Sequence, residues 1–387
     1  MNNKDTEIRP FRIRIAPEEI DELHERLART RWPDSLPGVG WTYGVPGDHL
    51  KELAEYWRTG FDWRAAEARL NRFAQFTTDI DGQRIHFLHV RSPEPDAVPL
   101  ILTHGWPSTF AEFRDVIGPL TDPRGHGAPD APAFHVVAPS VPGVAFSGPT
   151  TEPGWSIERM ARAWVELMDR LGYERYLAQG GDTGSLVSPE MGRVAPDQVM
   201  GVHVNGLVSA SMLDWTAEDP TAGFTEEETA LVYAGETDWE ERQGYAALQS
   251  TRPQTLAYAL TDSPVGVLAW NLEWFVDYDP ERGVQPPVDR DVVLTHVSLY
   301  WFTRTSGSAA RMYKDGGDAF YGGRDSGVPT AVALFPGDAP VRTLAERSNS
   351  IVRWTRYERG GHFAATQAPD LLTADVRAFA SELAGTG

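Results

Sequence analysis

Along this chain, short apolar runs that suit buried β-strands alternate with stretches in which apolar residues recur every three or four positions. The apolar runs lie at residues 99–103, 134–138, 176–179 and 201–205, and the amphipathic stretches between them lie at residues 108–119, 156–171 and 184–195. This alternation predicts strands joined by crossover helices, because parallel strands cannot be joined by a tight turn. The middle of the chain is therefore expected to form an α/β core around a parallel sheet.

The segments on either side of this core differ in character. On the N-terminal side we expect a strand at residues 11–15, helices from Pro17, over 48–58 and over 63–73, and strands at 73–80 and 84–90 around a turn at Asp81-Gly82. Residues 207–325 are rich in Trp and Tyr and are expected to be mostly helical, whereas strands return at 328–335 and 351–357 before a last helix over 369–385. The chain thus divides into an N-terminal segment (1–95), a core in two parts (96–206 and 326–387) and a helical cap between those parts (207–325).

Composition narrows the classes of function. Of the 387 residues, 41% are hydrophobic, which is enough to bury a large core. A net charge of −20 opposes binding to nucleic-acid phosphates or to an anionic membrane surface, so neither partner is expected. The absence of cysteine excludes disulfides, thiolate metal sites and cysteine nucleophiles. No apolar run reaches the roughly 18 residues of a membrane span, and the N-terminus lacks a secretory apolar stretch, so a cytoplasmic enzyme is expected.

The strongest chemical motif follows the apolar run at 176–179. Gly180-Gly181-Asp182-Thr183-Gly184 stands between that run and a helical stretch, which is the context of the nucleophile elbow of α/β-hydrolases. Asp182 would be the nucleophile. A carboxylate can displace at an sp³ carbon, whereas acyl transfer to it would give an anhydride, so epoxides or alkyl halides are the expected substrates. The alternative is a glycine-rich turn in which Asp182 only caps the helix.

A second motif supplies donors for an oxyanion. Residues 100–108 carry an apolar run into His104-Gly105-Trp106-Pro107, the sequence found at the oxyanion loop of many α/β-hydrolases. The backbone N–H groups of Trp106 and Thr183 are the predicted oxyanion hole, and Trp106 is also expected to line the substrate pocket. His104 precedes the nucleophile in the chain, which does not fit the order of a catalytic base, so we expect it to be structural.

The catalytic base and its orienting acid are expected near the C-terminus. His362 lies between the strand pattern at 351–357 and the last helix, and the order nucleophile, acid, histidine is that of α/β-hydrolases. Asp338 directly follows the strand pattern at 328–335 and is the predicted acid. Glu346 and Glu358 are weaker candidates for that role.

The other histidines do not form a metal site. His86 and His89 are three residues apart in one strand and therefore face opposite sides of it. His203 lies at a strand end and is expected to be structural. No strong metal-ligand spacing is present, so the reaction is expected to need neither a metal nor an organic cofactor.

These motifs together are similar to those of the microsomal-type epoxide hydrolases, and the likeness covers nearly the whole chain. The matching stretches are Ile8-Arg9-Pro10-Phe11 through Arg29-Thr30-Arg31-Trp32-Pro33, His104-Gly105-Trp106-Pro107, Gln179-Gly180-Gly181-Asp182, Ala259-Leu260-Thr261-Asp262-Ser263-Pro264-Val265-Gly266 and Arg359-Gly360-Gly361-His362-Phe363. The resemblance implies an α/β-hydrolase fold with an N-terminal module that wraps the core. It also implies that the enzyme turns an epoxide and water into a vicinal diol through an ester on Asp182.

The resemblance further implies two cap tyrosines that donate to the epoxide oxygen. They are Tyr245 and Tyr313, and the flanking residues match the family better at Tyr313. Four other tyrosines compete for the role, namely Tyr233, Tyr258, Tyr278 and Tyr300. Two departures from the family are Thr183, where Trp is common, and Asp338, where Glu is frequent.

Other functions and the substrate stay open at this point. A haloalkane dehalogenase also uses an Asp nucleophile, and Trp106 would serve as a halide-binding group. A non-catalytic α/β-hydrolase used for binding is disfavoured because the set of site residues is complete. An apolar pocket that suits an aryl epoxide is indicated by the cap tryptophans Trp239, Trp270, Trp274 and Trp301. Related bacterial enzymes act in natural-product pathways such as enediyne biosynthesis, and a homodimer is one alternative for the assembly.

Overall fold

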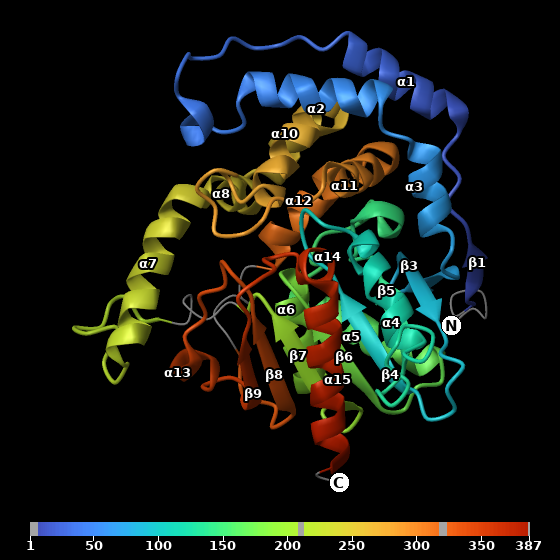
Figure 1. The fold of residues 1–387 in the computed structure, drawn as a ribbon, viewed down its shortest axis with the longest axis vertical. Helices are drawn as coiled ribbons and strands as arrows, with labels where there is room; N and C mark the ends of the chain where they lie inside the picture. The colour runs from blue at the N-terminus through green and yellow to red at the C-terminus, as the bar shows by residue number, and fades with distance from the viewer. Residues whose placement is uncertain (1–6, 208–212, 317–322, 386–387) are drawn as a thin grey trace.

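The centre of the molecule is a nine-stranded sheet, seen in a computed structural model that describes residues 7–207, 213–316 and 323–385 (Figure 1). In spatial order its strands are β1 (Arg9–Phe11), β2 (Gln75–Ile80), β3 (Gln83–Val90), β5 (Phe134–Pro139), β4 (Val98–Thr103), β6 (Tyr176–Gly180), β7 (Val199–Asn205), β8 (Pro329–Leu334) and β9 (Ser350–Arg356). The first four pair antiparallel, and the strands from β5 to β9 are parallel. The predicted α/β fold with a mostly parallel sheet is confirmed.

The inner strands are mostly apolar because the layers of the fold cover both of their faces. Nearly every side chain of β4 to β8 is buried. The covering helices of the core are α4 (Ile117–Thr121), α5 (Ile157–Arg170), α6 (Thr183–Val194), α14 (Ala364–Gln367) and α15 (Pro369–Gly385). In α5 the buried side chains Met160, Trp164 and Leu167 recur at helical spacing, and the Ser156 hydroxyl caps its first turn.

Two expected elements differ from the structure. The helix expected over 108–119 is a 3-10 helix, η2 (Phe110–Asp115), followed by the short α4. Pro119 has no N–H and lies in the first turn of α4, where none is needed, so it fits a helix that begins at Ile117 better than one that continues from residue 108. The strand expected over 11–15 lies earlier in the chain. Strand β1 ends at Phe11, and residues 12–15 belong to no strand. Side chains satisfy the next amides, because Asn71 Oδ1 accepts from Ile13 N and Glu67 Oε1 accepts from Ile15 N.

The cap consists of helices inserted between β7 and β8. They are α7 (Glu226–Arg242), α8 (Gly244–Thr251), α9 (Pro253–Asp262), α10 (Pro264–Phe275), α11 (Arg290–Thr303) and α12 (Ser306–Asp315). Smaller elements are η1 (Gly40–Tyr43), η3 (Ala145–Ser147) and α13 (Arg342–Ala345). Within the described parts of the chain, no helix is both long enough and apolar enough to cross a membrane.

The N-terminal helices lie over the cap rather than over the sheet. They are α1 (Pro17–Ala28), α2 (Gly47–Thr59) and α3 (Trp63–Leu70), and Figure 1 shows α1 and α2 running past α10. The Tyr56 hydroxyl donates to Asp291 at 2.8 Å, and Trp57 Nε1 donates to Ser298 Oγ at 3.0 Å. These bonds join α2 to α11, so the N-terminal segment holds the cap in place above the sheet.

Candidate active site

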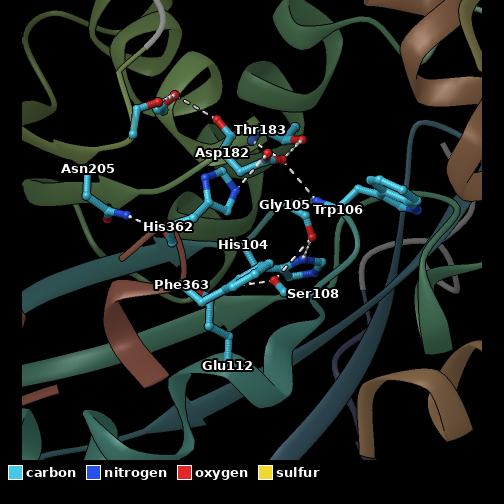
Figure 2. A network of polar contacts seen from close by, with 12 residues as sticks. His104, Gly105, Trp106, Ser108, Glu112, Asp182, Thr183, Asn205, His362 and Phe363 are labelled. Carbon is cyan, nitrogen blue, oxygen red and sulfur yellow. Dashed lines mark hydrogen bonds and ion pairs between the residues drawn. The ribbon is translucent and has the colours of Figure 1, made fainter. Parts of the chain in front are cut away.

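The predicted site residues come together at one edge of the sheet. Strands β4, β6, β8 and β9 are parallel, so the loops after them leave the same edge. Thr103 pairs with Gly180, which brings the ends of β4 and β6 level. Figure 2 shows the result, with Asp182 between the ring of His362 and the backbone of Trp106.

A strained turn holds Asp182 at the end of β6. Its φ and ψ are 52° and −120°, a conformation that L-residues seldom adopt. The turn needs glycine on both sides. A Cβ at Gly184 would lie 2.0 Å from Thr103 O, and a Cβ at Gly180 would lie 2.3 Å from Gly184 O. The sequence thus folds into a sharp elbow that lifts the carboxylate above the sheet.

The two carboxylate oxygens of Asp182 have different surroundings. Oδ1 accepts from Trp106 N at 3.0 Å, from Thr183 N at 2.6 Å and from the Thr183 hydroxyl at 3.0 Å. Oδ2 lies 3.3 Å from His362 Nε2. Burial alone would raise the pKa of Asp182, but the His362 ring and the two amides outweigh it and lower that pKa. The carboxylate is therefore ionised, with one oxygen held and the other available for attack.

His362, the predicted base, faces this carboxylate. Its Nε2 faces Asp182 Oδ2 at 3.3 Å as an ion pair, and no other hydrogen bond to Nε2 is found among the described residues. Burial alone would lower the pKa of His362, but the hydrogen bond and the charge of Asp182, followed by the charge of Asp338, raise it. The ring packs on Trp274 at a centroid distance of 4.8 Å.

Asp338 lies near His362 without bonding to its ring. Asp338 Oδ2 accepts from Phe335 N at 2.9 Å, and the two side chains shift each other's pKa electrostatically. Burial raises the pKa of Asp338 to about 6. No hydrogen bond joins it to the imidazole within the described residues. The two weaker candidates for the orienting acid are engaged elsewhere or exposed. Glu346 pairs with Arg342 at 2.7 Å, and Glu358 is exposed.

Two cap tyrosines, Tyr245 and Tyr313, lie beside Trp106 and within reach of the Asp182 charge. The rings of Tyr245 and Trp106 are stacked at 5.1 Å, and Tyr313 meets both edge-on, at 5.6 Å from Tyr245 and 5.9 Å from Trp106. Burial and the charge of Asp182 are among the causes that raise the pKa of both phenols, so both stay protonated donors. The competing tyrosines are engaged or remote, since Tyr300 donates to Ser108 O, Tyr278 donates to Arg242 O, and Tyr233 and Tyr258 are exposed.

The cap tryptophans divide into two groups. Trp274 lies 5.5 Å and Trp239 6.3 Å from the Tyr245 ring, so both belong to the aromatic surroundings of the site. Trp270 instead donates to Gln249 Oε1 at 3.0 Å, and Trp301 packs under Arg26 of α1. These two therefore serve contacts within the cap and with the N-terminal helices.

Sequence reasoning missed Gln285, a cap residue that reaches the catalytic loops. Its Oε1 accepts from His362 N at 2.5 Å. A Cβ at Gly337 or at Gly361 would lie 2.4 Å from the Gln285 side chain, so Gln285 fills the space between the loops that carry Asp338 and His362. In the sequence, the two glycines beside Asp338 and His362 are the signal of this close approach.

It also missed Glu112, in the 3-10 helix after the oxyanion loop. The carboxyl group is buried, and the Ser108 hydroxyl lies 2.5 Å from Oε2. Burial raises the pKa of Glu112 to about 7, and the charge of Asp182 acts in the same direction. Nothing in its sequence position distinguishes it from an exposed helical glutamate.

Comparisons with known proteins agree with this arrangement. The family described as "Epoxide hydrolase N terminus" matches residues 8–113, and that described as "alpha/beta hydrolase fold" matches residues 98–284. The chain is 42% identical to the "Putative epoxide hydrolase" of Stigmatella aurantiaca, over 96% of this chain and 84% of that protein. It is 36% identical to "Epoxide hydrolase 1" of Sus scrofa, over 97% and 89%. The structure of Aspergillus niger epoxide hydrolase superposes with a TM-score of 0.85 at 31% identity, covering 98% of this chain and 97% of that one.

Proposed function

Since the chain belongs to the microsomal-type epoxide hydrolases and converts an epoxide to a diol, we propose that it does so through a covalent ester on Asp182. The observation that carries this proposal is the unequal environment of the carboxylate. Backbone amides hold Oδ1, while Oδ2 faces His362 below the two cap phenols. Family membership also decides against the haloalkane dehalogenase and the non-catalytic binding protein.

In the first step Asp182 Oδ2 attacks an epoxide carbon. A bond forms between Oδ2 and that carbon, the C–O bond of the ring breaks, and its electron pair stays on the ring oxygen. Tyr245 and Tyr313 donate hydrogen bonds to this oxygen as it becomes an alkoxide. The proton that finally neutralises it comes from His362, because the hydrogen bond and the charge of Asp182, which do most to raise the pKa of His362 against burial, are lost when the ester forms. The products of the step are a glycol monoester and a neutral imidazole.

In the second step the ester is hydrolysed. Nε2 of His362 takes a proton from a water molecule, and the resulting hydroxide attacks Cγ of Asp182. The charge then collects on Oδ1, where the Trp106 and Thr183 amides already point. Collapse breaks the ester bond, the diol leaves with its proton, and the carboxylate and imidazolium are restored. Asp338 stabilises the positive charge on His362 during this step.

A single turnover in heavy-oxygen water tests the ester directly. With enzyme in excess, the first diol should contain ordinary oxygen from Asp182, and the heavy label should appear in the peptide that contains Asp182. Label in the first diol would instead mean that water attacks the epoxide without an ester. Asp182→Ala should fold and show no turnover, whereas the same substitution at Asp130, an acidic residue on the loop before β5, should leave turnover normal.

For the substrate we propose a hydrophobic epoxide that carries an aryl group. The support is the aromatic surroundings formed by Trp106, Tyr245, Trp274 and Tyr313 around the nucleophile. Styrene oxide should therefore show a higher kcat/KM than a small aliphatic epoxide, and the reverse order would contradict the proposal. A role in enediyne-type biosynthesis and a homodimeric assembly stay predictions, to be tested by gene context and by the mass in solution.

A further inference from the structure

The peptide unit between Gly105 and Trp106 is held on both of its sides. Its N–H, on Trp106, donates to Asp182 Oδ1 at 3.0 Å. Its carbonyl, on Gly105, lies 3.0 Å from His104 Nδ1 and 3.2 Å from the Ser108 hydroxyl. The C=O and N–H of a trans peptide point in opposite directions, so whatever holds the carbonyl also aims the N–H. Figure 2 shows His104 and Ser108 on the side of Gly105 away from Asp182.

The proton on His104 can be assigned from its partners. Val141 N donates to His104 Nε2 at 3.1 Å, so Nε2 is an acceptor. Nδ1 must then carry the proton, and it donates to Gly105 O. Burial lowers the pKa of His104 to about 4, which keeps the ring neutral. The first of the two bonds to the Gly105 carbonyl is therefore fixed by the tautomer.

The second bond depends on Glu112. The Ser108 hydroxyl has one proton but two oxygen neighbours, Gly105 O at 3.2 Å and Glu112 Oε2 at 2.5 Å. A carbonyl oxygen cannot donate. If Ser108 donates to Gly105, the short contact with Glu112 is a hydrogen bond only when Glu112 is protonated and donates to Ser108. Burial raises the pKa of Glu112 to about 7, against the opposing effects of the Ser108 hydrogen bond and the charge of His362, and no described cationic side chain forms an ion pair with it, so the neutral form is favoured.

We propose that Glu112 is a positioning residue, a neutral carboxylic acid that starts a hydrogen-bond chain through Ser108 to the oxyanion peptide. Each donor polarises the next, so the chain aims the Trp106 N–H and strengthens it as a donor. The effect is largest when full negative charge sits on Asp182 Oδ1, which happens in hydrolysis of the ester and not in ring opening. The expectation that the effect falls on ester hydrolysis rests on the ester mechanism proposed above.

Three variants separate this role from packing. Glu112→Gln can still donate to Ser108 through its amide, whereas Glu112→Ala cannot, and Ser108→Ala breaks the next link. We expect Glu112→Ala and Ser108→Ala to slow ester hydrolysis about tenfold and to raise the fraction of enzyme carried as ester during turnover. Rapid quenching and intact protein mass measure both quantities. Glu112→Gln should hydrolyse the ester several times faster than Glu112→Ala.

Matched controls remove buried polar groups far from the elbow. Glu67→Ala deletes the carboxylate that accepts from Ile15 N, and Ser298→Ala deletes the hydroxyl that accepts from Trp57. Both should cost stability and leave the ester fraction unchanged. If the ester fraction rose in these controls as much as in Ser108→Ala, the inference would be overturned, because the effect would then come from a general loss of stability.

The protonation state has its own readout, which does not depend on activity. Infrared spectra of the wild-type protein should show the carbonyl stretch of a buried protonated carboxyl group, and Glu112→Gln should lack it. Absence of that band, or a Glu112→Gln variant as slow as Glu112→Ala, would overturn the inference. Failure of the proposed function looks different, because His362→Gln would then form no ester at all.

Discussion

The Thr183 hydroxyl offers the sharpest test of how the site divides its two steps. It donates to Asp182 Oδ1 at 3.0 Å, beside the amides of Trp106 and Thr183 itself. Thr183→Val removes this one donor and keeps the shape of the side chain and the backbone N–H. Any change in rate then reports the hydroxyl alone.

The expected effect differs in sign between the steps. In the resting enzyme the carboxylate shares its charge between two oxygens, and the hydroxyl stabilises this state before ring opening. Its loss should leave ester formation unchanged or slightly faster. In ester hydrolysis the full charge sits on Oδ1, where a hydrogen bond to a charged acceptor contributes about 1.5–3 kcal/mol. Because two amides remain, we expect the lower end, roughly a tenfold slower hydrolysis.

Rapid quenching followed by intact protein mass gives both rate constants. The variant should accumulate ester during turnover, whereas Thr183→Ser, which keeps the hydroxyl, should behave like the wild type. Slower ester formation with unchanged hydrolysis would refute the assignment of Oδ1 as the oxyanion. So would equal losses in the Val and Ser variants, since these would report packing of the methyl group.

Further predictions follow from the same geometry. Tyr313→Phe should slow ester formation more than ester hydrolysis, and replacing Tyr245 as well should remove most activity; a loss below about tenfold for the double variant, near 1.4 kcal/mol, would show that the wrong pair was chosen. Gly105→Ala should abolish turnover in a folded protein, because a Cβ there would lie 1.9 Å from Asp182 Oδ1; normal kcat would exclude this contact. The charge of Asp182 raises the pKa of His362, so NMR should find a lower pKa for His362 in Asp182→Asn, the neutral mimic of the ester. An unchanged pKa there would mean that the pair is not coupled.

The parts of this protein that follow from local patterning were predictable from the sequence. The apolar runs became β4 to β8 because a doubly covered parallel strand must be apolar on both faces. The glycines around Asp182 signalled the elbow because only glycine avoids the contacts of about 2 Å at those positions. The expected strand at 11–15 does not form because Glu67 of α3 and Asn71 just after it, and not a neighbouring strand, accept from its amides.

What the sequence could not show is which side chains the fold buries and which distant residues it brings together. Gln285 reaches His362 N from a cap loop 77 positions earlier, and no local pattern announces such a contact. Glu112 becomes notable only because the fold buries it beside Ser108. The assignment of Asp338 was possible because it rests on chain order, but its distance from the His362 ring depends on the packing of both loops around Gln285.

The central claim, that Asp182 opens the epoxide and His362 releases the product, is tested most directly by trapping the ester. His362→Gln should be mixed with excess styrene oxide, quenched, and measured as intact protein. The account predicts a gain equal to one whole substrate molecule, mapped to the peptide that contains Asp182, and no adduct in the double variant with Asp182→Ala. No adduct across a panel of small and large epoxides, or an adduct on another residue, would contradict it.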